Sequence, residues 1–133
     1  SFGFIEHFEN AVEIVKKHIN LMKEGGKLII EVPNFSGFNG FLHNLVDKPN
    51  LQKHNTSIMN LEFFKKIAEE NNLKIIYLGY YGSFHFQWGY GRLHTANPLQ
   101  VILYAILKLI SKITIHIKMR NKFSNYIVFI AEK

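Results

Sequence analysis

The stretch LMKEGGKLIIEVPN, residues 21–34, decides the fold class. Its glycine pair, Gly25-Gly26, predicts the end of a helix, because glycine tolerates the left-handed backbone of a helix stop. The nearly continuous apolar run from Lys27 to Val32 predicts a strand with both faces covered by helices. Pro33 ends this strand and opens a loop that contains glycine and asparagine. A buried strand preceded by a helix indicates an α/β fold.

The residues before this stretch predict one helix and the end of one strand. Apolar side chains recur at helical spacing from Phe8 to Met22. Asn10 and Glu13 have the spacing of a helix cap with its reciprocal acidic partner. The apolar run from Phe2 to Ile5 is typical of a strand end.

The residues after it continue the alternation of helices and strands, which predicts a parallel sheet. Residues 47–57 are polar and are expected to be irregular. The expected elements are a helical turn over 41–46, a helix from its cap Asn60 to Asn71-Asn72, a strand over 73–81, a long helix over 99–117 and a strand over 126–131. Between them, residues 82–98 form an aromatic, glycine-rich stretch with Trp88 and Tyr90.

Two blocks of this sequence resemble class I S-adenosylmethionine-dependent methyltransferases. The block SFGFIEHF, residues 1–8, resembles the end of that family's fourth strand, where a Glu-His pair opens the next helix. The block at 21–34 resembles the family's lead into its fifth strand, with Glu24 where proline is usual. The helix at 61–70 and the turn at 72–74 resemble the approach to the sixth strand, with Asn-Leu replacing Gly-Phe. The resemblance covers residues 1–81.

This resemblance implies the C-terminal half of a Rossmann-like methyltransferase fold. Parallel strands would be followed by a final antiparallel strand over 126–133, with a helical insertion at about 82–124 between the last two strands. Residues 1–133 would then be a partial methyltransferase domain. The family's Gly-rich loop and the acidic residue that holds the ribose are not found in this chain. We therefore expect a fragment that is inactive alone, with an unpaired strand edge that invites self-association.

The implied activity is methyl transfer from S-adenosylmethionine to a small-molecule, sugar-linked or lipid-linked acceptor. Phe2, Gly3 and Phe4 are expected to line the cofactor. Glu6 and His7 are the candidate catalytic residues, because the ordinary pKa of histidine suits a general base near neutral pH. The alternative is that Glu6 and His7 only cap the following helix, where an acidic group is favourable.

Asn34, His54 and Tyr81 are the candidate acceptor-binding residues. Asn34 follows a strand on the expected ligand edge, although it equally suits a turn. Tyr81 belongs to an aromatic group that would wall a pocket or fill the core. We expect no metal site, because His43, His54 and His85 are far apart in sequence and the chain has no cysteine.

The chain carries 16 Lys and Arg against 10 Asp and Glu, a formal charge of +6. This charge is either a solubilising surface or a site for acidic partners, and we expect no nucleic-acid partner. The helix at 99–117 is interpreted as a lid, a homo-oligomer surface or a peripheral membrane contact of a cytoplasmic protein. Two other functions stay open: a non-catalytic module for oligomerisation or binding of acidic partners, and lipid modification like that of a cyclopropane synthase.

Overall fold

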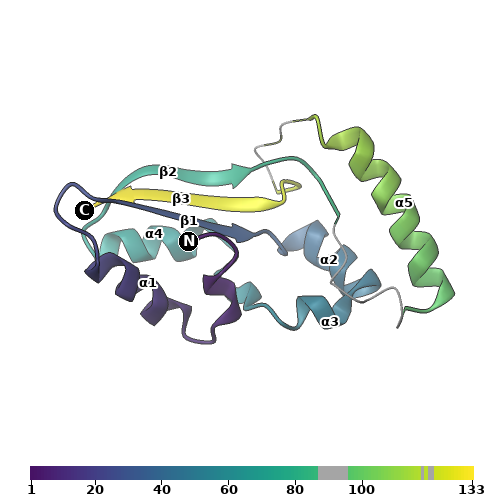
Figure 1. Cartoon of the computed structure of the whole chain (residues 1–133), viewed down its shortest axis with the longest axis horizontal. Helices are drawn as coiled ribbons and strands as arrows, with labels where there is room; N and C mark the ends of the chain where they lie inside the picture. Colours follow the sequence, from purple (N-terminus) through teal and green to yellow (C-terminus); the bar gives the residue numbers. More distant parts are fainter. Residues whose placement is uncertain (87–95, 118, 120–121) are drawn as a thin grey trace.

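The computed structural model describes residues 1–86, 96–117, 119 and 122–133. Within them, β1 (Lys27–Pro33), β2 (Lys74–Tyr81) and β3 (Tyr126–Glu132) form one sheet in the order β1-β3-β2 (Figure 1). β3 is antiparallel to both of its neighbours, so β1 and β2 run in the same direction. The protein is therefore α/β, with a small sheet whose last strand is reversed.

The expected parallel sheet is not what the described strands form. Every hydrogen-bonded pair among β1, β2 and β3 is antiparallel. Among the described residues, parallel pairing is confined to a bridge between Phe2 and Glu31 at the free edge of β1. The expected strand end at residues 2–5 is reduced to this bridge, because a 3-10 turn, η1 (Ile5–His7), begins directly after it.

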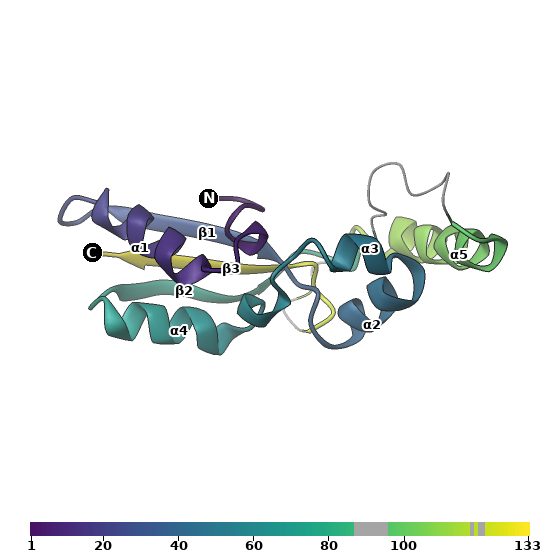
Figure 2. The same ribbon diagram turned by 90° about the horizontal axis from the view of Figure 1, so that it is seen from below.

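Two helices cover one face of the sheet. α1 (Ala11–Asn20) and α4 (Leu61–Glu70) lie on the same side of the strands (Figures 1 and 2). The main core lies between these helices and the inward side chains of the sheet, among them Val15, Phe64 and Phe129. The burial of this apolar surface is the main favourable contribution to folding.

The prediction that helices cover both faces of the strand at 27–32, which is β1, is wrong. In β1 the inward side chains Leu28, Ile30 and Val32 are buried, whereas Ile29 is 42% exposed on the other face. The apolar run predicts a strand that is buried on both faces, but α1 and α4 pack on one side only. The outer face keeps its apolar side chains without a helix over them among the described residues.

The predicted helix caps are confirmed. The side chain of Asn10 accepts a hydrogen bond from the amide of Glu13 at 3.3 Å, and that of Asn60 accepts one from Phe63 at 2.8 Å. Each cap satisfies an amide that the first turn of a helix leaves without a partner. α1 ends at Asn20, and Gly25 adopts a φ of +74° in the turn that leads into β1.

The segment expected to be irregular between residues 47 and 57 contains two short helices. α3 (Lys48–Leu51) has Pro49 in its first turn, a position that proline favours, and η2 (Thr56–Ile58) follows it. α2 (Gly37–Val46) precedes them and is longer than the single turn expected at 41–46. These helices lie beyond the ends at which β1 and β2 finish (Figures 1 and 2).

The long helix α5 (Pro98–Thr114) lies at the same end of the molecule (Figure 1). It begins at a reciprocal cap formed by Asn97 and Gln100. Its residue Leu107 packs in a second small apolar cluster with Leu42, Val46, Phe84 and Phe86. Its outer surface exposes large apolar side chains: Leu99, Ile102, Ile106, Leu109 and Ile113.

In the described residues, no helix combines the length and the apolar character needed to cross a membrane. Trp88 and Tyr90 lie outside the described residues.

Candidate functional site

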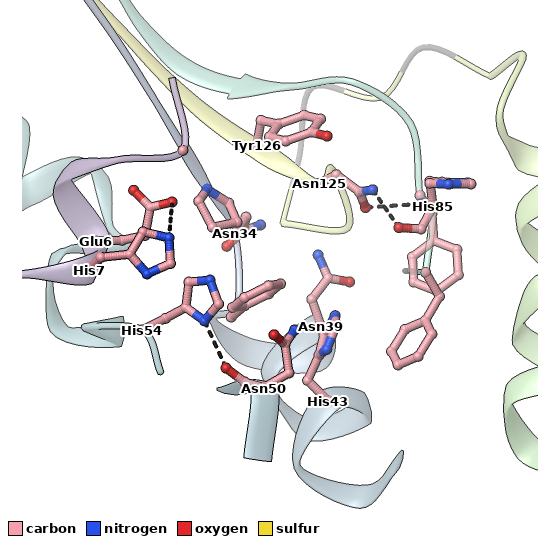
Figure 3. A pocket seen from close by; sticks show the side chains of 15 residues that line it. Glu6, His7, Asn34, Asn39, His43, Asn50, His54, His85, Asn125 and Tyr126 are labelled. Atoms are coloured by element: carbon pink, nitrogen blue, oxygen red, sulfur yellow. Dashed lines mark hydrogen bonds and ion pairs between the residues drawn. The ribbon is translucent and has the colours of Figure 1, made fainter. Parts of the chain in front are cut away.

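A pocket of about 360 Å³ opens where β1 and β2 end and β3 begins (Figure 3). Side chains from the N-terminal turn, α2, α3 and the loops around β3 converge on it. Polar groups dominate the labelled wall: Glu6, His7, Asn34, Asn39, His43, Asn50, His54, His85, Asn125 and Tyr126. Such convergence at the carboxyl ends of strands is typical of ligand sites in α/β proteins.

Glu6 and His7 enter this pocket from η1. The carboxylate oxygen Oε1 of Glu6 lies 3.9 Å from Nε2 of His7, and Glu6 is only 1% exposed. Nδ1 of His7 lies 3.4 Å from the carbonyl oxygen of Lys53. Asn10 caps α1, so the alternative interpretation of Glu6 and His7 as helix caps does not describe their position.

His54 faces His7 across this part of the pocket (Figure 3). Their ring centroids are 4.7 Å apart. Nδ1 of His54 lies 2.8 Å from the carbonyl oxygen of Asn50, one helical turn earlier. A carbonyl only accepts, so in the neutral ring the hydrogen is on Nδ1 and the lone pair is on Nε2. The ring is thus fixed in orientation with a basic atom available.

Asn55 ties the two histidine-bearing segments together. Its backbone amide donates to the carbonyl oxygen of Glu6 at 2.6 Å. Its side-chain amide donates to the carbonyl oxygens of Phe8 and Glu9, each at 3.1 Å. Three hydrogen bonds from one residue therefore hold the Glu6-His7 turn against the loop that carries His54.

Asn34 is buried, and its side chain is used by the protein itself. Its amide donates to the carbonyl oxygens of Lys122 and Ser124, and its Oδ1 accepts from Ser36. Asn39 also donates to the carbonyl oxygen of Ser124. These bonds hold the loop before β3 against the end of β1. Asn34 lines the pocket, but its amide hydrogens point to the chain, which favours its interpretation as a turn residue.

An aromatic wall closes the other side of the pocket. The ring of His43 lies between Phe35 and Phe86, with centroid distances of 4.3 and 4.4 Å. Burial, assisted by the positive charge that His54 can carry, lowers the pKa of His43 to about 4. His43 is therefore neutral at physiological pH and contributes an uncharged polar surface.

Two further ionisable groups near the sheet end are shifted by burial. Burial raises the pKa of Tyr126, and the negative charge of Glu31 raises it further. The pKa of Glu31 is itself raised by burial and by the charge of Glu6, against the opposing effect of the N-terminal ammonium. Tyr126 consequently offers a neutral hydroxyl, able to donate or accept, to the pocket that it lines.

The structure brings together five of the residues singled out from the sequence and leaves three aside. Gly3, Glu6, His7, Asn34 and His54 line the pocket. Phe2 is 68% exposed, and Phe4 packs its ring on Phe8 with centroids 4.9 Å apart. Tyr81 lines a shallow hollow on the uncovered face of the sheet, with Tyr77 and Val128. Neither Phe2, Phe4 nor Tyr81 is part of the pocket wall.

Sequence reasoning missed several residues of the pocket. Asn39, Asn50 and Asn125 stand in no recognisable motif, and His43 and His85 have no spacing that links them. Asn125 and His85 pair through two hydrogen bonds between the side chain of one and the backbone of the other (Figure 3). The usable signal was the density of Asn and His in the segments that follow β1 and β2 and in the loop before β3, since these segments meet at one end of the sheet.

Comparison with known proteins gives no match for this chain, either to a protein-family model or to a curated protein sequence.

Proposed function

We propose that this chain is the acceptor-binding, C-terminal part of a class I S-adenosylmethionine-dependent methyltransferase. The acceptor would be a small molecule or a sugar-linked or lipid-linked compound bound in the 360 Å³ pocket. One observation carries the proposal. The pocket lies at the carboxyl ends of two strands with the same direction, and it gathers Gly3, Glu6, His7 and His54.

The sheet supports the same proposal. β1 and β2 have one direction and β3 is reversed, in keeping with the final antiparallel strand that the resemblance implies. Phe2 pairs with Glu31 in parallel at the free edge of β1. A Rossmann-like sheet would continue at this edge, because a parallel neighbour is already started there. The helices on one face leave the other face for elements that such a sheet would add.

The residues of the chain fit one side of a cofactor site. Gly3 lines the pocket with a φ of +55°, a conformation that other residues rarely adopt, and a backbone without a side chain allows close approach. When bound, S-adenosylmethionine would supply the methyl group on its sulfonium. The family's Gly-rich loop is not in this chain, so we expect the 133 residues alone to bind the cofactor weakly.

The chain's own residues would orient the acceptor and take up a proton. His7 is the candidate general base: its Nδ1 lies near the carbonyl of Lys53, which leaves Nε2 with the lone pair beside Glu6. Tyr126 and the wall of Phe35 and Phe86 would hold the rest of the acceptor.

Calorimetric titration of S-adenosylhomocysteine tests the proposal. The ligand is titrated into the 133-residue chain and into a longer chain that includes any coding sequence upstream of Ser1. We expect tighter binding to the longer chain, and weaker binding when Gly3 is replaced by valine in it. Lys23→Ala, in the turn before β1 and outside the pocket wall, is the control. Binding to neither chain would overturn the proposal.

A non-catalytic role in oligomerisation is the second candidate, and the uncovered sheet face is the observation that favours it. This face presents Ile29, Tyr77, Tyr81, Val128 and Ile130, of which Ile29 and Tyr81 are exposed. Light scattering over a concentration series, on the wild type and on Ile29→Lys, separates the two candidates. A concentration-dependent dimer that Ile29→Lys abolishes, together with no binding of S-adenosylhomocysteine, would favour oligomerisation.

A further inference from the structure

We propose that Glu6, His7 and His54 form a binding site for a divalent first-row transition-metal ion. One carboxylate oxygen and one nitrogen of each imidazole all lie within 4.8 Å of one another. The three side chains come from η1 and from the loop after α3, and they converge on one point in Figure 3. This proposal concerns metal binding and does not rest on methyl transfer.

Both histidines present a lone pair to this point. Nδ1 of His54 lies 2.8 Å from the carbonyl oxygen of Asn50, and Nδ1 of His7 lies 3.4 Å from that of Lys53. A carbonyl oxygen only accepts, so a neutral ring that donates through Nδ1 keeps its lone pair on Nε2. Histidine ligands of metals commonly donate their other ring hydrogen to a backbone carbonyl in this way.

Glu6 supplies an independent reason for a cation here. Its side chain is 1% exposed, and in the described part of the chain its Oε2 has no hydrogen-bond partner. Its other oxygen is 3.9 Å from His7, too far for a hydrogen bond. A buried carboxylate without full compensation is costly, and a metal ion bound to Glu6 would compensate its charge.

Metal binding requires the three ligand atoms to move closer together. Bonds of about 2.0–2.2 Å place neighbouring ligand atoms of a metal about 3.0–3.5 Å apart, closer than the 4.8 Å limit found here. His7 has a side chain 47% exposed and can rotate inward. Glu6 is held by burial, and His54 is held by its bond to Asn50. Asn55 fixes the two backbone segments relative to each other.

The donor set indicates the class of metal. Two imidazoles and one carboxylate suit Zn²⁺, Fe²⁺ or Mn²⁺, whereas an oxygen-only set would suit Mg²⁺ or Ca²⁺. Three protein ligands also leave coordination positions open, as in catalytic rather than structural sites. Both pockets that Glu6, His7 and His54 line would give a further ligand access to those positions. His7 as a metal ligand would use the lone pair that a general base needs.

The competing interpretation is an ordinary ion pair between His7 and Glu6. An ion pair does not involve His54, whereas a metal site needs all three side chains. Replacement of His54 therefore separates the two interpretations. Glutamine is the suitable replacement at Glu6 and His54, because it keeps most of the side-chain volume and removes the charge or the ring nitrogen.

The test is calorimetric titration of ZnCl₂ into the chelator-treated 133-residue chain, with its thermal midpoint measured at each zinc concentration. We expect one saturable equivalent per chain and a rise of Tm in the wild type. Glu6→Gln and His54→Gln should each weaken zinc binding at least tenfold and remove the rise of Tm. His116→Gln, an exposed histidine beyond α5, should change the affinity by less than twofold.

Two results would overturn the proposal. The first is the lack of saturable binding in the wild type. The second is adventitious binding of zinc to histidines. It would show as equal zinc affinity in the wild type and His54→Gln, or as a loss of affinity in His116→Gln as large as that in His54→Gln. Circular dichroism of each variant without zinc shows whether it is folded, and His54→Asn takes the place of His54→Gln if the latter is not. Zinc and S-adenosylhomocysteine are titrated separately, so the two proposals can fail independently.

Discussion

The imidazole rings of His7 and His54 face each other with their centroids 4.7 Å apart, although the two residues are distant in the sequence. His7 follows the short bridge that Phe2 forms with β1, and His54 follows α3. Asn55 creates this relationship, because the residue next to His54 bonds to the backbone of Glu6, Phe8 and Glu9. One short loop therefore assembles the polar side of the pocket. Single substitutions in this loop test how much these contacts contribute to the free energy of unfolding.

Replacement of Asn55 by aspartate should loosen this assembly. Aspartate keeps the oxygen that accepts from Ser57 but removes the amide hydrogens that reach Phe8 and Glu9. We expect a loss of about 1–3 kcal/mol in the free energy of unfolding, because two backbone carbonyls lose their donor and face a carboxylate. Urea denaturation measures it. Asn71→Asp removes a single such bond, to Ile67, and should cost less.

Acid should destabilise the fold through His43. Its pKa is about 4 in the folded chain and near 6.5 when unfolded, so the unfolded chain binds more protons between these values. The contribution of neutral His43 to the free energy of unfolding is complete above pH 6.5. This free energy decreases by up to about 3 kcal/mol as the pH falls towards 4.

Unfolding free energies measured between pH 7.5 and 4.5 check this prediction. His43→Phe keeps an aromatic ring between Phe35 and Phe86 and should flatten the dependence on pH. His116→Phe, outside the pocket, should keep the wild-type slope. A wild-type slope in His43→Phe would show that another group is responsible.

The one-sided core predicts unequal costs for phenylalanine truncations. Phe64 is fully buried on α4 and stacks on Phe129 of β3 with centroids 5.3 Å apart. Phe64→Ala should cost about 3–5 kcal/mol, because it leaves a cavity in the core. Phe2 is 68% exposed, and Phe2→Ala should stay within about 0.5 kcal/mol. Chemical denaturation compares them, and similar costs would contradict the described packing.

The cap of α4 should contribute measurably. Asn60 accepts from the amide of Phe63 at 2.8 Å, so Asn60→Ala should cost about 1 kcal/mol and Asn60→Ser much less. Thermal unfolding followed by circular dichroism measures the difference. Equal midpoints for the wild type and Asn60→Ala would exclude a contribution from the cap.

The sequence by itself determined the elements whose signals are local. Helical periodicity and the caps Asn10 and Asn60 located α1 and α4, and the strands at 27–33, 74–81 and 126–132 were found within one or two residues. These signals are readable because capping and periodicity act within a few residues of the chain. The short helices of 47–58 were missed, since their few turns carry too little periodicity.

Only the tertiary structure decided which side chains meet. The order β1-β3-β2 and the one-sided covering of the sheet depend on contacts between distant segments. His7 and His54 carry no shared motif, because their alignment follows from backbone bonds of Asn55 rather than from a spacing. Tyr81 and Phe4, chosen for their chemistry, were carried elsewhere by strand register and ring packing. Side-chain type and local pattern are thus written in the sequence, while convergence is a property of long-range packing, which no local pattern encodes.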